Sequence, residues 1–68
     1  MIAMQPVASS MIAAVGYDDE KQQLVVQFNN GREYKYGGVP ASEFNALVAA
    51  QSVGQYFAAN IKNVYRVE

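Results

Sequence analysis

The chain contains neither cysteine nor histidine, and this double absence excludes most catalytic and metal chemistry. Without cysteine there is no disulfide framework and no cysteine-ligated zinc site. Without histidine the usual general base and the commonest metal ligand are missing. Ser9 and Ser10 therefore have no partner with which to form a catalytic triad. We expect a protein that is not an enzyme, with no catalytic residues, no metal site and no cofactor.

The sequence also lacks a strong excess of charge and a membrane-type segment. Five Lys or Arg against six Asp or Glu give a formal net charge of −1, which does not indicate nucleic-acid binding. The acidic run at residues 18–20 lacks the ligand spacing and glycine of a calcium loop. The apolar N-terminus has no Lys or Arg and is broken by Gln5 and Pro6, so it predicts neither a signal peptide nor a membrane span. We expect a cytoplasmic protein.

The length of 68 residues allows one domain, and the hydrophobic content of 51% predicts a packed core. We take residues 1–68 as that domain, with residues 1–8 as a flexible or extended arm. A chain of this size has modest stability, which must come from the core alone or from oligomerisation.

Three strands are expected at residues 12–17, 23–28 and 32–36, where β-branched and aromatic residues gather between turn signals. Residues 29–31, Asn-Asn-Gly, form a hairpin signal with two registers. A two-residue turn places Val26 opposite Lys35 and spoils the apolar face of the sheet. A three-residue loop with a left-handed Gly31 instead places Val26 opposite Tyr34. We prefer the second register, which turns Tyr34 and Tyr36 toward the core and Lys35 away from it.

Two helices and a short strand complete the expected fold. The first helix starts at Pro40 and carries an apolar stripe at Phe44, Leu47 and Val48. The second begins after Ser52, with Gln55 completing a capping-box pattern. Residues 64–67 are a candidate C-terminal strand. The sequence predicts an α+β fold, in which an antiparallel three-stranded meander precedes two short helices packed on one sheet face.

With its residues in this order, the chain resembles the KTSC domain, a small domain found at the C-terminus of some lysyl-tRNA synthetases and as a free-standing protein of bacteria and phages. The resemblance runs from Ser9 to the end. It is carried by Ser9-Ser10, Gly16-Tyr17-Asp18, Leu24, Val26, Phe28, Gly31, Tyr34-Lys35-Tyr36, Val39-Pro40, Ser52, Gly54, Tyr56-Phe57 and Ile61. RNA binding is what the synthetase attachment implies, and a phage-encoded form implies the host cytoplasm.

Five residues form a candidate nucleic-acid site: Arg32, Tyr34, Tyr36, Lys62 and Arg66. The tyrosines would stack on unpaired bases and the three cations would contact phosphates. The alternative is that both tyrosines pack under the helices with their hydroxyls at the rim, while the cations are ordinary solubilising charge. The preferred hairpin register favours that alternative for the tyrosines.

A second candidate surface lies on the opposite face of the sheet, at Ile12, Ala14, Val25, Gln27 and Lys35. If the helices cover only one side, this face is exposed and partly apolar, which marks a partner site. A bulge near residues 13 and 14 would instead bring Ile12 into the core. We expect a non-catalytic interaction module that binds a protein, either itself or a host protein, through this face. The alternative is a module that binds RNA or single-stranded nucleic acid. We expect no membrane partner.

Overall fold

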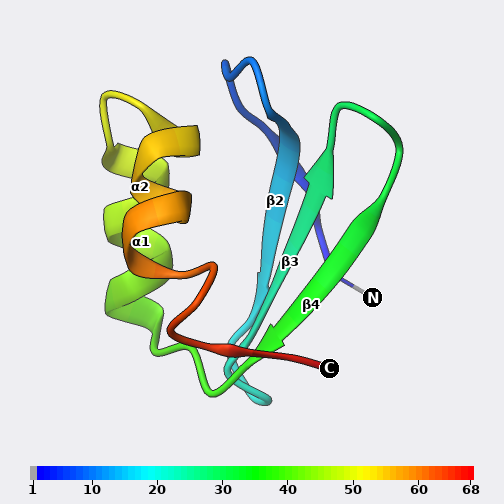
Figure 1. The fold of residues 1–68 in the computed structure, drawn as a ribbon. Coiled ribbons are helices and arrows are strands. Elements are labelled where there is room, and N and C mark those ends of the chain that lie inside the picture. The colour runs from blue at the N-terminus through cyan, green and yellow to red at the C-terminus, as the bar shows by residue number, and fades with distance from the viewer. Residues whose placement is uncertain (1) are drawn as a thin grey trace.

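The computed structural model describes residues 2–68 and has two layers, one sheet and one pair of helices (Figure 1). The elements are β1 (Gln5–Pro6), β2 (Ile12–Asp18), β3 (Gln23–Phe28), β4 (Glu33–Gly37), α1 (Ala41–Ala49), α2 (Val53–Asn60) and β5 (Arg66–Val67). All neighbouring strands are antiparallel, in the order β1-β2-β3-β4-β5. The expected α+β class and the packing of both helices on one sheet face are confirmed.

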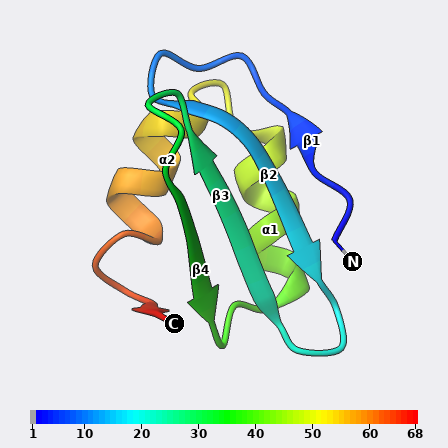
Figure 2. The same cartoon turned by 90° about the vertical axis from the view of Figure 1, so that its right-hand side faces the viewer.

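The expected number of strands is wrong, because two short edge strands extend the three-stranded meander to five. β5 falls within the candidate strand at residues 64–67 and pairs with the end of β4. β1 lies in the segment expected to be a flexible or extended arm, and it runs beside β2 at the opposite edge of the sheet (Figure 2). Pro6 is compatible with β1 because an edge strand does not need every backbone N–H for pairing.

The hairpin between β3 and β4 has the register expected from its three-residue loop. Val26 pairs with Tyr34 and Leu24 with Tyr36. Gly31 has φ 91°, and its N–H donates to the Phe28 carbonyl oxygen at 2.9 Å. This left-handed conformation suits glycine, which has no Cβ to clash with the backbone. The turn therefore fixes which side chains of β4 face the helices.

A bulge in β2 brings Ile12 into the core, as the second alternative for that residue predicts. Ile12 pairs with Phe28 and Ala14 with Gln27, so Ala13 is the extra residue in the ladder. Beyond the bulge, Val15 pairs with Val26 and Tyr17 with Leu24. Ile12, Val15 and Tyr17 consequently reach the helix-facing side of the sheet together with their partners on β3, whereas Ala14 faces the other side.

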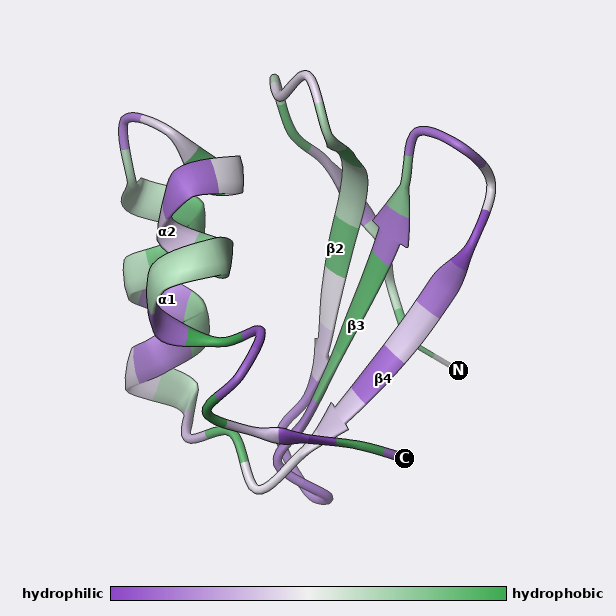
Figure 3. Cartoon of the chain, viewed as in Figure 1, coloured by the Kyte–Doolittle hydropathy of each residue, from purple (hydrophilic) through white to green (hydrophobic). Residues whose placement is uncertain are grey.

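The helices complete the core as expected. The Ser52 side chain accepts a hydrogen bond from the Gln55 N–H at 3.3 Å, which caps the start of α2. The fully or nearly buried core comprises Ile12, Val15, Leu24, Val26, Tyr36, Val39, Leu47, Val53, Phe57 and Ile61. The hydrophobic residues of the sheet gather on β2 and β3, while β4 and its preceding loop are largely hydrophilic (Figure 3). Within residues 2–68, neither helix has the length and apolar content to cross a membrane.

Candidate functional site

A groove opens between the β3–β4 hairpin and α2, on the helix-facing side of the sheet. Its volume is about 300 Å³. It is lined by Met11, Phe28, Asn30, Arg32, Tyr34, Tyr36, Phe57, Ala58 and Lys62. We call it the aromatic groove. It brings together four of the five residues expected in a nucleic-acid site, from segments up to thirty residues apart in the chain.

Four rings form a connected aromatic cluster in the wall and floor of the groove. The ring centroids of Phe28 and Tyr34 are 5.5 Å apart, and those of Phe28 and Phe57 are 5.6 Å apart. Phe57 also lies 5.6 Å from Tyr36. All three pairs are edge-to-face, with interplanar angles of 67–72°. This is a favourable packing geometry, and it leaves the groove with rigid apolar walls.

The two tyrosines of β4 have different environments. Neither exposure to a ligand nor burial under the helices describes both of them. Tyr36 is 3% exposed and packs under α2, as the core alternative predicts. Burial raises the pKa of Tyr36, and the neighbouring Tyr34 raises it further, so the Tyr36 hydroxyl is neutral at physiological pH. Tyr34 is 37% exposed, and part of its ring is open to a ligand in the groove.

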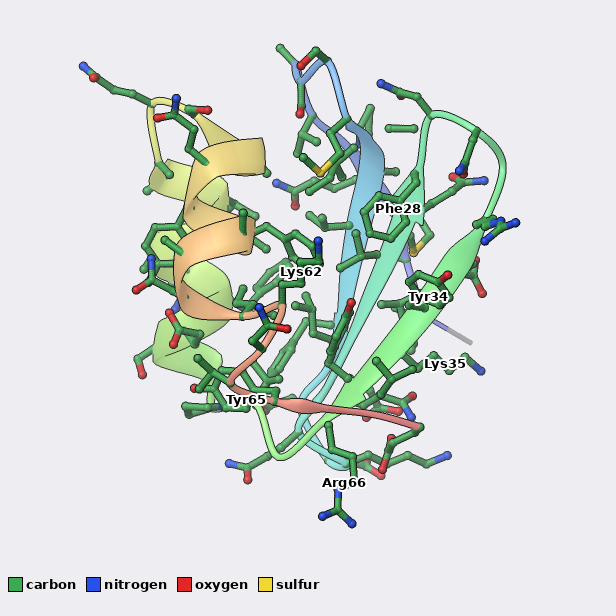
Figure 4. The ribbon with its side chains drawn as sticks, in the orientation of Figure 1. Phe28, Tyr34, Lys35, Lys62, Tyr65 and Arg66 are labelled. Atoms are coloured by element: carbon green, nitrogen blue, oxygen red, sulfur yellow. The ribbon has the colours of Figure 1, made fainter. Side chains whose placement is uncertain are left out.

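The cations also divide into two groups. Arg32 at the hairpin and Lys62 after α2 both line the groove and are exposed. Lys62 extends from the end of α2 toward the sheet, on the side where Phe28 and Tyr34 lie (Figure 4). Arg66 lies on β5 and points away from the groove, so the structure does not bring it together with the other two (Figure 4). Lys35 points to the other face of the sheet, as its register predicts.

The exposure expected for the opposite sheet face, here called the outer face, is wrong for its apolar residues. Ile12 is fully buried in the core, Ala14 is 8% exposed and Val25 is 3% exposed. Gln27 is half-buried and only Lys35 is exposed.

The cover over the outer face is the N-terminal strap, which we define as residues 2–6. A Cβ placed on Gly16 would lie 2.6 Å from Ile2 Cγ2 and 2.7 Å from Met4 Sδ. Because Gly16 faces away from the helices, these two side chains lie on the outer face. Sequence reasoning missed this cover because nothing in residues 1–8 alternates like a long strand.

Ser9 and Gly54 form a close structural contact between the bend before β2 and the start of α2. The Ser9 hydroxyl oxygen accepts from the backbone N–H groups of Met11 and Ile12, at 3.1 and 3.2 Å. A Cβ on Gly54 would lie 3.2 Å from this oxygen. Ser9 therefore shapes the chain bend before β2, as expected for a serine that bonds local backbone, and Gly54 lets α2 approach it.

One carboxylate joins both helices to the C-terminal segment, in a cluster that the sequence did not reveal. Glu43 of α1 accepts hydrogen bonds from the hydroxyls of Tyr56 in α2 and Tyr65, the latter at 3.0 Å. The hydrogen bond to Glu43, followed by burial, raises the pKa of Tyr56. Burial, followed by the hydrogen bond to Glu43, raises the pKa of Tyr65. Both tyrosines act as neutral donors that hold the two helices and the segment before β5 together.

Comparison with known proteins gives consistent results for this chain. The family model for the KTSC domain matches residues 8–65. A protein of Tsukamurella paurometabola is 43% identical over 63 residues, which cover 93% of this chain and 94% of that protein. The crystal structure of a KTSC domain protein from Yersinia pestis superposes with a TM-score of 0.96 at 34% identity, covering 100% of this chain and 96% of that one.

A longer relative places the same domain within an enzyme. The lysine–tRNA ligase of Nostoc punctiforme is 36% identical over 59 residues, which cover 87% of this chain but only 10% of the ligase. The match therefore concerns a small part of the ligase and not its remaining sequence. Because the family model covers most of the chain and a near full-length relative is 43% identical, the protein belongs to the KTSC domain family.

Proposed function

We propose that this domain is a non-catalytic module that binds single-stranded nucleic acid in the aromatic groove. The observation that carries the proposal is the position of Arg32 and Lys62 beside the partly open ring of Tyr34. An aromatic surface next to cations matches the chemistry of a nucleotide, which combines a flat base with an anionic phosphate. The relatives that are lysine–tRNA ligases support the RNA form of this proposal.

The expected binding is weak and depends on salt. Only two cations line the groove, and the net charge of the chain is −1, so long-range attraction of a polyanion is small. The favourable term is stacking of a base on Tyr34, which contributes about 1–3 kcal/mol in comparable sites. A groove of about 300 Å³ is also small, which favours a short contact over a long track along the strand.

Titration of a labelled single-stranded oligonucleotide at low salt tests the proposal. Tyr34→Ala should weaken binding by about 5- to 100-fold if a base stacks on this ring. Lys62→Gln should weaken it and lower the slope of log affinity against log salt by about 0.7, the value for one lost phosphate contact. Arg66→Gln is the matched control, because Arg66 is exposed but lies outside the groove.

Two results would contradict nucleic-acid binding in the groove. The first is the absence of any salt-sensitive binding at high protein concentration. The second is an equal loss of affinity in Lys62→Gln and Arg66→Gln, which would assign the effect to overall charge instead of to the groove.

A second candidate function is protein binding at the outer face, by a second copy or a host protein. The supporting observation is that this face already accepts apolar side chains, those of Ile2 and Met4, next to Gly16. Size-exclusion chromatography with light scattering, before and after Val25→Glu, tests the self-association form. If both proteins are monomers at high concentration, self-association at this face is wrong.

A further inference from the structure

Because Gly16 has no side chain, it leaves a recess in β2 in which the N-terminal strap packs. We call this recess the Gly16 notch. A Cβ on Gly16 would lie 2.6 Å from Ile2 Cγ2, 2.7 Å from Met4 Sδ and 3.0 Å from the Ala3 carbonyl oxygen. A Cβ at this point of β2 would therefore force the Ile2 and Met4 side chains of the strap to shift from their observed places. The notch is specific for the shape of this segment, because two side chains and one backbone oxygen fill it together.

The strap is attached by few backbone bonds compared with the rest of the sheet. β1 pairs with β2 at only two positions, Gln5 with Val15 and Pro6 with Ala14. One further bond runs from the Val7 N–H to the Ala13 carbonyl oxygen at 3.1 Å. The helix-facing core does not include the strap. The strap can consequently detach while the helix-covered core stays folded.

The charges beside the strap are balanced in sign. A cavity of about 320 Å³ on the outer face is lined by Ile2, Met4 and Val25 together with Asp18, Glu33, Lys21 and Lys35. A two-fold interface places one patch against an identical patch, so it needs both signs within the patch. A polyanion would meet two carboxylates here. This balance fits a second copy of the chain better than a nucleic acid.

We propose that the outer face is an interface between two copies of this chain, formed by exchange of their N-terminal straps. The strap of each copy occupies the Gly16 notch of the other, and the chain opens at Val7 and Ala8, between the strap and the bend that Ser9 holds. Exchange preserves every contact of the strap, since each copy carries both the segment and the notch. The mixed charges around Lys35 and Glu33 then face their counterparts across the two-fold axis. This inference rests on the second candidate function and names the partner, and it is independent of the aromatic groove on the other face.

A disulfide placed between strap and notch distinguishes exchange from the closed monomer. The chain has no cysteine, so Pro6→Cys/Ala14→Cys introduces a single pair. Directly paired antiparallel residues have Cα atoms about 4.5–5.5 Å apart, within the range of about 4.4–6.8 Å that a disulfide spans. The protein is equilibrated at high and at low concentration, oxidised, and analysed by non-reducing electrophoresis and mass spectrometry.

Exchange predicts a covalently linked dimer whose fraction rises with the protein concentration before oxidation. Intrachain disulfides alone, at every concentration, would overturn the proposal. The two single-cysteine variants measure the background of collisional dimers. Adding Gly16→Val should reduce the linked dimer to that background, because the larger side chain fills the notch in both copies. An unchanged dimer fraction would overturn the proposal as well.

Because Gly16→Val could lower the dimer fraction simply by impairing folding, a second variant tests the interface without changing Gly16. Glu33→Lys leaves strap and notch intact but makes the surrounding charge basic, and it should lower the dimer fraction several-fold in the same assay. Light scattering separates strap exchange from self-association without exchange. A dimer in solution that carries only intrachain disulfides overturns exchange and leaves self-association standing, whereas a monomer in both assays overturns both. Oligonucleotide affinity per chain should be the same in monomer and exchanged dimer.

Discussion

The two faces of the sheet are covered in different ways. The inner face is covered by two helices, which bury a continuous core that includes Phe57 and Ile61. The outer face is covered by a few strap residues that fit around Gly16 and shield Val25. Two side chains that are equally buried, one on each face, can therefore contribute differently to the stability of the fold. A side chain on the inner face is held by many neighbours, while one on the outer face depends on a segment with few bonds.

The largest expected effect is on the inner face, from Phe57→Ala. Phe57 is 1% exposed and contacts the rings of Phe28 and Tyr36. Its removal should cost about 3–5 kcal/mol. A chain of this length has a total stability of roughly 3–10 kcal/mol, so the variant should be largely unfolded at elevated temperature. Urea unfolding followed by circular dichroism measures this. Phe44→Ala, at a half-buried position, is the control and should cost clearly less.

Adjacent valines of β3 compare the two faces directly. Val26 is 0% exposed on the inner face and Val25 is 3% exposed on the outer face. Val26→Ala should cost about 2–3 kcal/mol, from lost burial and from a cavity that rigid neighbours cannot fill. Val25→Ala should cost about 1–2 kcal/mol, because the strap can settle into the space. Equal losses in denaturant unfolding would show that the strap packs as firmly as the helices.

A smaller and local effect is expected from Gly16→Ala. The three heavy atoms nearest to the new Cβ all belong to the strap, so the strap should detach more often. Amide hydrogen exchange should become faster at Val7, whose N–H bonds to Ala13, and stay unchanged at Ile61, whose N–H bonds to Phe57. If exchange increases equally at both amides, the strap is part of the global folding unit and the two faces are not separable.

The smallest effect concerns the cluster around Glu43, which joins the two helices that cover the inner face to Tyr65. The folded-state pKa of Tyr65 is raised, so the neutral hydroxyl is stabilised by folding. This contribution is fully present below the ordinary tyrosine pKa of about 10 and is lost as pH rises through the raised value. Tyr65→Phe should therefore lower Tm at neutral pH, and the difference from the parent protein should narrow at alkaline pH. A constant difference across this range would contradict the role of the hydroxyl.

Much of the fold could be predicted because its signals are local. Asn29-Asn30-Gly31 predicted the β4 register, the apolar stripe of Phe44, Leu47 and Val48 predicted the buried side of α1, and Ser52 predicted the start of α2. Each of these depends on backbone conformations or side-chain periods within one segment.

The candidate site was predicted less completely, since it depends on how segments pack. Arg32, Tyr34 and Lys62 line one groove, but Phe57 was not among the expected site residues and Arg66 lies elsewhere. The strand count and the exposure of Val25 were wrong for a related reason. β1 has only two residues, too few for an alternating pattern, and its pairing depends on β2 already being in place.

By itself the sequence determined the α+β class, the pairing of the central strands and the absence of histidine and cysteine chemistry, because turn residues, side-chain periods and residue types act locally. Only the tertiary structure decided that Tyr34 is half-open while Tyr36 is buried, that Lys62 joins Arg32 across the groove, and that the N-terminal strap covers Gly16. These outcomes follow from the relative placement of segments far apart in the chain, where a side chain's exposure is set by what packs against it and not by its own position in a strand or helix.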